Sequence, residues 1–542
     1  MTPVARHPIP KPPLIARWAT LVLALALVFS SACKTPLVSS TSADTTSPAD
    51  SGLSDGSTLD SSSLVDLAAT LDAAPFDDRS TPDDVMTLDA LAEDAEADDF
   101  ESDAEMDGLG ADLGDVAPDA GDDRFTVYRP GLRHLPLTPR IKARLRTLYL
   151  EGLALGNRPH VFAKIGASLE DVPTYFLGCM GTSKMDLADH DALQPSVDFF
   201  AQPIDASNPS ENSFNRDSLA AISGWTASDA LALRYDNNTK SAIEKELETI
   251  KPAFAIVAFG GNDMRDYSWR GDDDVLSFLP RFIEVVELLL AHKTIPILRT
   301  LKREDGTGRY VERIHHFNAI LYMVAQTYEL PMMDLYTAIG DIPTAITSAD
   351  GIHLTSYSNG GVKTCAFTPA ALQYGNNIYN LLALESLDRL RRVIVDDEPP
   401  LEPPIPLVGD GSNDAPYRID QPLFGQANDT SLSPYQSIDA YSCGPQKETG
   451  PEWTYRLEIP NDANGQSQTG TLTLTIFEKS PIDVDLQLLA STDPESCLAR
   501  HNYRITQSVT SGSYVFTVDT FENASGVTHP GPFMITVVFR PN

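Results

Sequence analysis

Four short segments between residues 166 and 353 contain the residue types of a nucleophilic acyl-transfer site. A serine hydroxyl attacks a carbonyl carbon once a base takes its proton, and a histidine serves as that base when a carboxylate orients its ring. Backbone N–H groups and an asparagine amide can stabilise the oxyanion that forms. Because each residue type is common, their order and context carry the information. The segments are Gly166-Ala167-Ser168, Gly224, Gly260-Gly261-Asn262-Asp263 and Asp350-Gly351-Ile352-His353.

The individual residues have clear chemical roles and equally clear structural alternatives. Ser168 would project from the rim of a sheet with its N–H at a helix start, although alone it is more typical of a helix cap. Asp350 can orient His353 across a turn at Gly351, although an isolated Asp-x-x-His is more often a turn or surface pair. Asn262 and Gly224 offer amide and backbone donors, and alone both are also typical of turns.

Strand-like and helix-like segments alternate between residues 125 and 395, which predicts a three-layer α/β/α domain with a parallel sheet. Ligand-binding residues of such sheets follow the carboxyl ends of strands. Ser168 and Asn262 each come three residues after an expected strand. His315 and His316 fall in a helical pattern and are expected to be structural or exposed. The expected strands are residues 161–165, 253–259, 295–298 and 332–335, and the longest expected helices are 278–292 and 311–327.

The four segments together resemble the sequence blocks of SGNH (GDSL-type) hydrolases. In that family, block one carries the serine, block two a glycine, block three Gly-x-Asn-Asp and block five Asp-x-x-His. Residues 374–377 and 380–384 also resemble the closing helix of such domains, so the resemblance covers residues 125–395. No Gly-x-Ser-x-Gly motif occurs, which argues against the serine turn of α/β-hydrolases.

The resemblance implies a serine hydrolase of ester bonds that forms a covalent acyl ester on Ser168 and uses no cofactor. His353 would move the proton, Asp350 would hold its tautomer, and the N–H groups of Ser168 and Gly224 with the Asn262 amide would bind the oxyanion.

One position departs from the family pattern. Block one usually reads Gly-Asp-Ser, and Ala167 stands here in place of the aspartate. That aspartate typically supports the loop by hydrogen bonding and does not perform the chemistry. Its loss leaves the triad formally complete but admits an altered or weakened site.

Residues 1–33 are expected to be a lipoprotein-type signal peptide. Basic residues precede an apolar run, residues 18–29, that is too short to span a bilayer comfortably. Ser30-Ser31-Ala32-Cys33 resembles a lipobox, with Ser30 where leucine is usual. The resemblance implies a lipidated Cys33 and membrane attachment through that lipid, and Lys34 favours the outer membrane of a Gram-negative cell. The alternative is ordinary signal cleavage, which gives a periplasmic or secreted protein.

Residues 34–124 are predicted to be a disordered acidic linker that tethers the folded part. The stretch 34–123 contains 25 acidic and 2 basic residues, a contribution of −23 to the chain's net charge of −36. Few apolar side chains remain there to offset the ordering entropy. The chain has no basic stripe of the kind that binds phosphates, so nucleic acid is not expected as a partner.

Export permits disulfides among the other four cysteines. Cys443 and Cys497 lie in one C-terminal module and are the easier pair to propose, and Cys179 and Cys365 flank the site segments. Three pairings are open, and the sequence does not choose among them. No Cys-x-x-Cys motif or histidine-rich cluster indicates a metal site.

The prolines of residues 396–414 predict a stiff, extended linker, and residues 415–542 predict a β-sandwich. Residues 482–489, 497–498 and 511–519 resemble pre-peptidase C-terminal sandwiches. Asp483 and Asp485 are more typical of edge-strand carboxylates than of calcium ligands. The expected strands are residues 453–459, 471–477, 484–488, 514–518 and 533–539.

The main expectation is therefore an exported, membrane-tethered serine esterase that hydrolyses an acyl ester of a carbohydrate or lipid, either a small molecule or a polysaccharide. The alternative is a non-catalytic cell-surface binding lipoprotein that keeps the fold as a scaffold. Ala167 and the appended sandwich motivate that alternative.

Overall fold

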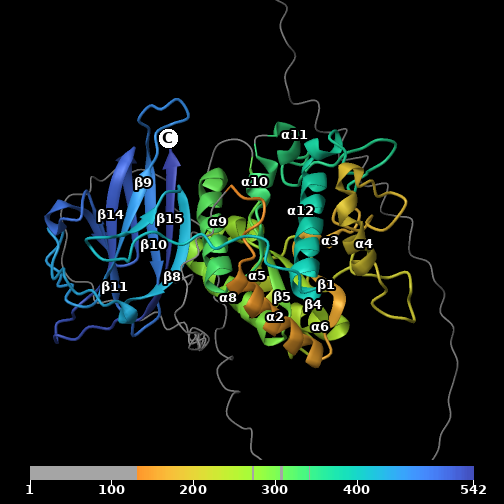
Figure 1. The fold of residues 1–542 in the computed structure, drawn as a ribbon, viewed down its shortest axis with the longest axis horizontal. Helices are drawn as coiled ribbons and strands as arrows, with labels where there is room; N and C mark the ends of the chain where they lie inside the picture. Colours follow the sequence, from red (N-terminus) through yellow and green to blue (C-terminus); the bar gives the residue numbers. More distant parts are fainter. Residues whose placement is uncertain (1–130, 271–273, 305–308, 341) are drawn as a thin grey trace, which may run out of the picture. The chain divides into compact units, whose positions relative to one another are not determined.

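The structure is a computed structural model that describes residues 131–270, 274–304, 309–340 and 342–542. Every described residue belongs to one and the same unit of the chain (Figure 1). The expected signal peptide, Cys33 and the acidic linker lie outside the described residues. Within the described residues, no helix is long and apolar enough to cross a membrane.

A four-stranded parallel sheet forms the centre of the N-terminal domain, in the order β1-β4-β5-β6. Every residue of β4 and β5 is buried, as expected for strands that are covered on both faces. The apolar runs at residues 253–259 and 295–298 predicted these two strands to within one residue at each end. The strands are β1 (Arg158–Gly166), β4 (Pro252–Ala258), β5 (Ile295–Arg299) and β6 (Met332–Met333).

Helices cover both faces of this sheet and give the expected three layers. In one group α4 contacts α12, and α2 contacts the π-helical segment Arg391–Val395 that continues α12. The other group contains α5 to α9. A short hairpin of β2 (Leu233–Tyr235) and β3 (Lys240–Ser241) precedes α6. The helices are α2 (Pro139–Ala154), α3 (Ser168–Asp171), α4 (Gln194–Phe200), α5 (Ala227–Leu231), α6 (Ala242–Ile250), α7 (Gly261–Arg270), α8 (Asp274–Ala291), α9 (Arg309–Thr327), α10 (Leu335–Ile339), α11 (Pro343–Ile346) and α12 (Gly375–Leu390).

The C-terminal part is a β-sandwich of two sheets with its own apolar core. The sheets have the orders β13-β10-β15-β8 and β12-β11-β14-β9-β7, and all pairs are antiparallel except β7 with β9. The five expected strands are present, and four more were not predicted. The strands are β7 (Tyr417–Ile419), β8 (Leu423–Asp429), β9 (Trp453–Ile459), β10 (Thr469–Phe477), β11 (Val484–Leu489), β12 (Cys497–His501), β13 (Arg504–Thr510), β14 (Gly512–Thr520) and β15 (Pro532–Pro541).

The sandwich is not held at a distance by a spacer, because β8 and β15 pack directly on α9. Leu423, Met534 and Val538 from these strands belong to the same apolar cluster as the α/β domain. At Gly425 the approach is so close that a Cβ atom would lie 2.6 Å from Met323 Cβ. The C-terminal sandwich therefore shares a core with the α/β domain.

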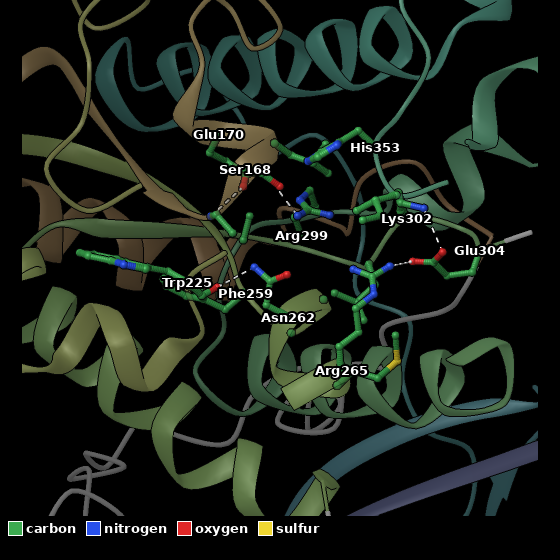
Figure 2. A pocket seen from close by; sticks show the side chains of 18 residues that line it. Ser168, Glu170, Trp225, Phe259, Asn262, Arg265, Arg299, Lys302, Glu304 and His353 are labelled. Carbon is green, nitrogen blue, oxygen red and sulfur yellow. Dashed lines mark hydrogen bonds and ion pairs between the residues drawn. The ribbon is translucent and has the colours of Figure 1, made fainter. Parts of the chain in front are cut away.

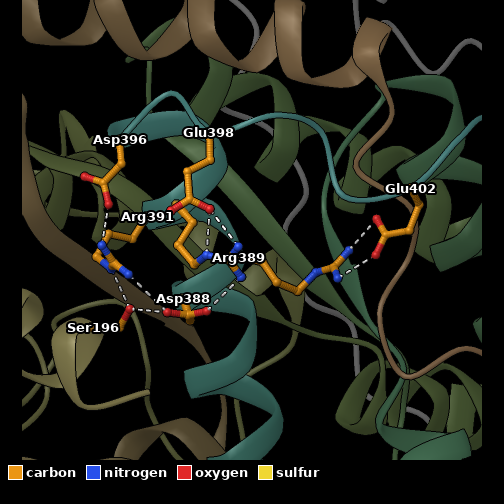
Figure 3. A network of polar contacts seen from close by, with 8 residues as sticks. Ser196, Asp388, Arg389, Arg391, Asp396, Glu398 and Glu402 are labelled. Atoms are coloured by element: carbon orange, nitrogen blue, oxygen red, sulfur yellow. Dashed lines mark hydrogen bonds and ion pairs between the residues drawn. The ribbon is translucent and has the colours of Figure 1, made fainter. Parts of the chain in front are cut away.

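The proline-rich segment after α12 also lies against the α/β domain, and ion pairs explain why (Figure 3). Arg389 donates to both carboxylate oxygens of Glu402, at 2.8 and 3.0 Å, while Arg391 pairs with Asp396 and Arg392 with Glu398. The carboxylates of this segment bind back to arginines at the end of α12 and in the π-helical segment that follows it. Proline content alone does not reveal this effect.

Candidate active site

Ser168 is the first residue of α3 and lies two residues beyond the end of β1. The backbone of Gly166 pairs with a neighbouring loop: its N–H donates to Ala220 O at 3.0 Å, and its carbonyl accepts from Ile222 N–H at 3.3 Å. The turn that bears Ser168 is therefore joined to the loop that leads into Gly224.

Gly224 lies in an exposed turn with φ of +87°, a conformation that favours glycine. The turn is tied to α3, because Asp171 accepts hydrogen bonds from the N–H and the hydroxyl of Ser223, at 2.9 and 2.6 Å. A Cβ atom at Gly224 would meet nothing within 4 Å. The positive φ, and not contact with other protein atoms, is therefore the reason for glycine at this position.

Asn262 and Asp263 begin α7 just after β4 and hold this corner of the site. The buried Asp263 carboxylate accepts hydrogen bonds from the N–H groups of Ala227 and Gly260, both at 2.9 Å. Burial raises its pKa to about 6. The Asn262 amide donates to Trp225 O at 2.9 Å, which leaves its second N–H for another acceptor.

His353 Nδ1 lies 2.7 Å from Asp350 Oδ2, so the spacing of three residues does bring the two side chains together. The Asp350 carboxylate also accepts from Ser348 Oγ at 2.6 Å and from the N–H groups of Ile352 and His353 at 2.9 Å. These donors, led by the Ser348 hydroxyl, hold the pKa of Asp350 well below its usual value. The geometry fits a carboxylate that fixes the tautomer of an imidazole.

One pocket brings these elements together (Figure 2). Ser168, Asn262 and His353 all line it, and it encloses about 540 Å³ of empty space, part of which is open to solvent. Gly224 is not among the lining residues, whereas its neighbour Trp225 is. The pocket thus unites three of the four sequence segments directly and the fourth through an adjacent residue.

Residues 179–357 match the model of the GDSL-like Lipase/Acylhydrolase family. This part of the chain is a GDSL-like domain. The match includes Gly224, Asn262, Asp350 and His353 and begins after Ser168, so the family model itself does not reach the proposed nucleophile.

Solved structures to which the chain is similar include a GDSL-like lipase from Bacteroides thetaiotaomicron, which is 15% identical with a TM-score of 0.25. The match covers 46% of this chain and 98% of that protein. The esterase EstA from Pseudoalteromonas is 15% identical with a TM-score of 0.25, over 43% of this chain and 99% of that one. A pre-peptidase C-terminal domain of a collagenase from Bacillus anthracis is 11% identical with a TM-score of 0.15, over 23% and 92%. No curated protein sequence matches the chain.

Of the three pairings that the sequence left open, the structure contains the one with two disulfides, Cys179–Cys365 and Cys443–Cys497. Cys179–Cys365 joins the segment after α3 to the segment after His353 in the GDSL-like domain, and Cys443–Cys497 lies in the sandwich. Among the described residues, no group of three or more His, Cys, Asp or Glu side chains is arranged to hold a metal ion.

His315, which the helical pattern predicted to be structural or exposed, has a structural role. His315 packs edge-to-face on Tyr336, and burial, with Arg540 and Arg303 nearby, lowers its pKa to about 4.

The charged wall of the pocket was not predicted from the sequence. In this wall Glu304 pairs with Arg265 at 2.8 Å and with Lys302 at 3.2 Å. Lys302 and Glu304 follow β5 by a few residues, so their position after a strand end was the available signal.

Proposed function

We propose that the chain is an exported serine esterase that hydrolyses an acyl ester with Ser168, His353 and Asp350 as its triad. The observation that supports this most is the 2.7 Å contact of His353 with Asp350, made at the wall of a pocket that Ser168 and Asn262 share. The match to a family of lipases and acylhydrolases supports the hydrolase class.

In this mechanism the Ser168 hydroxyl oxygen attacks the ester carbonyl carbon while His353 Nε2 takes the hydroxyl proton. The tetrahedral intermediate collapses to an acyl ester on Ser168, and the histidine gives its proton to the leaving alcohol. Water then repeats the sequence: His353 takes a proton from the water, the acyl group leaves as a carboxylic acid, and the serine is restored.

In this proposal three N–H donors bind the oxyanion of each tetrahedral intermediate. The second N–H of the Asn262 amide and the backbone N–H groups of Ser168 and Gly224 have this role. Trp225, whose carbonyl accepts from Asn262, fixes the direction in which that amide points.

The ester is one of a carbohydrate or a lipid, and the enzyme reaches it from a membrane surface through a lipid on Cys33. The acidic residues that follow Cys33 keep the folded part away from the surface by mutual repulsion. Detergent partitioning of the wild type against Cys33→Ala tests the anchor, and equal partitioning of the two proteins would refute it.

A fluorophosphonate probe applied to the full chain tests the nucleophile. We expect labelling of the wild type, loss of labelling in Ser168→Ala, and unchanged labelling in Ser513→Ala, which removes an exposed hydroxyl of the sandwich. Circular dichroism of each protein verifies folding. If the folded wild type takes no label, the esterase hypothesis is refuted. The alternative hypothesis, a non-catalytic binding lipoprotein, would then remain. Short-chain aryl esters and acetylated sugars then define the substrate.

A further inference from the structure

Ala167 stands where the family's aspartate would support the nucleophile turn, and another carboxylate lies beneath that turn. Glu170 is 1% exposed, and its Oε2 accepts a hydrogen bond from the Ala167 N–H at 3.2 Å. A Cβ atom at Gly166 would lie 2.6 Å from the same oxygen. Glycine at residue 166 thus makes room for the Glu170 carboxylate directly under the residues that precede Ser168.

The other carboxylate oxygen of Glu170 is held from two distant parts of the chain. Tyr379 Oη, on α12, donates to Oε1 at 2.6 Å, and Arg299 Nη2, at the end of β5, lies 3.4 Å from the same atom. The Arg299 guanidinium also lies over the Tyr379 ring, 5.1 Å from its centre. Glu170 is therefore fixed to the sheet and to α12 at once.

The charge pattern explains why all three groups occur together. Burial raises the pKa of Glu170, whereas Arg299, the Tyr379 hydroxyl and the Ala167 N–H lower it. A carboxylate in such a site persists only if its oxygens are paired and hydrogen-bonded. Glu170 and Arg299 also line the pocket with Ser168 and His353 (Figure 2), so this network forms part of the pocket wall beside the nucleophile.

We propose that Glu170 is the positioning residue for the Ser168 nucleophile and replaces the support that Ala167 lacks, with Arg299 and Tyr379 holding it in place. This proposal rests on the proposed function, since it requires Ser168 to be the nucleophile. Glu170 acts through the backbone of residues 166–168 and does not exchange a proton with the substrate.

The test compares Glu170→Ala and Glu170→Gln with the wild-type full chain in hydrolysis of 4-nitrophenyl acetate. A displaced nucleophile of about 1 Å lowers kcat on the order of 100-fold. We expect such a loss in Glu170→Ala, with KM within about threefold of wild type because the pocket that binds the ester persists. Glu170→Gln keeps one oxygen for the Ala167 N–H and should recover part of kcat. The fluorophosphonate labelling rate should fall in parallel.

Glu246→Gln is the matched control, because Glu246 is a fully buried carboxylate that pairs with Arg216 and the Leu219 N–H and lies outside the pocket lining. It should lower thermal stability and leave the kcat of the folded protein within about twofold. If both Glu170 variants keep wild-type kcat while Ser168→Ala is inactive, the positioning role is wrong and the esterase stands. If the wild type neither hydrolyses ester nor takes the probe, the proposed function itself is wrong.

Discussion

Asp350 holds His353 with one carboxylate oxygen and is itself held by three donors on the other. Oδ2 contacts His353 Nδ1 at 2.7 Å, and Oδ1 accepts from the Ser348 hydroxyl and from the N–H groups of Ile352 and His353. Asp350→Asn keeps the shape but presents an amide to the imidazole and favours the wrong tautomer. We expect kcat for an aryl ester to fall on the order of 10³- to 10⁴-fold with KM little changed.

The donors around Asp350 also set a pH dependence. These donors lower the pKa of Asp350 in the folded protein below its value in the unfolded chain. The ionised carboxylate therefore supports His353 in full at any pH above the unfolded pKa. This support is lost only when the pH falls through the folded-state pKa. Ser348→Ala removes the leading donor and should move the pKa of Asp350 upward. At pH 8 the kcat of Ser348→Ala should stay within about threefold of wild type, because Asp350 is still ionised there. If Asp350→Asn also keeps a kcat within about threefold of wild type, Asp350 does not orient His353.

Asn262 provides a test of oxyanion binding. Asn262→Ala removes a donor that strengthens its bond only as charge develops, so kcat should fall about 10²- to 10³-fold with KM nearly constant. Steady-state kinetics on an aryl ester give both constants. Asn208→Ala, at an exposed amide that bonds Glu211, is the control and should alter neither. A rise in KM at constant kcat in Asn262→Ala would instead assign the amide to ground-state binding.

Features set by local pattern could be predicted from the sequence. Residues 253–259 form a continuous apolar run, and the buried strand Pro252–Ala258 is found there because only a strand covered on both faces hides every side chain. The turn at Gly351 and the spacing of Asp350 and His353 are likewise local. The expected contact between these two side chains is present at 2.7 Å.

Features that depend on long-range contacts could not be predicted in this way. Glu170, Arg299 and Tyr379 come from three elements, and their meeting depends on how β5 and α12 pack. The one local signal was Glu170 three residues after Ala167, the spacing of a capping carboxylate. The packing of the sandwich on α9 was missed for a similar reason, since the close approach at Gly425 is visible only in three dimensions.

The close approach of β8 to α9 predicts that Gly425 tolerates no side chain. A Cβ there would lie 2.6 Å from Met323 Cβ and 2.8 Å from Ala319 O, so the strand or the helix must move. Gly425→Ala should lower the free energy of unfolding by about 1–3 kcal/mol, as measured by urea denaturation. Glu312→Ala removes a rim contact 3.6 Å from Arg540 and should change it by less than about 0.5 kcal/mol. Equal stability of Gly425→Ala and wild type would show that the sandwich and helix are not tightly packed.

Glu448 and Asp485 form a buried carboxylate pair in the sandwich, each 1% exposed, with Arg500 beside both. Burial, and then the Asp485 carboxylate, raise the pKa of Glu448 above its usual value. A folded-state pKa above the unfolded one means that the native state holds the proton more tightly. The contribution to stability is thus complete below the unfolded pKa, about 4.3, and is lost as pH rises through the folded value.

Glu448→Gln removes the ionisation and keeps the shape of the side chain. It should match the wild type in free energy of unfolding near pH 4, where Glu448 is protonated, and exceed it at pH 9, where the wild type must hold two neighbouring carboxylates with one arginine. Urea denaturation across this range gives the difference as a function of pH. Glu495→Gln, at an exposed carboxylate of the same domain, should follow the wild-type curve. A Glu448→Gln curve parallel to wild type throughout would mean that Glu448 has the same pKa in the folded and unfolded states and that its burial does not perturb it.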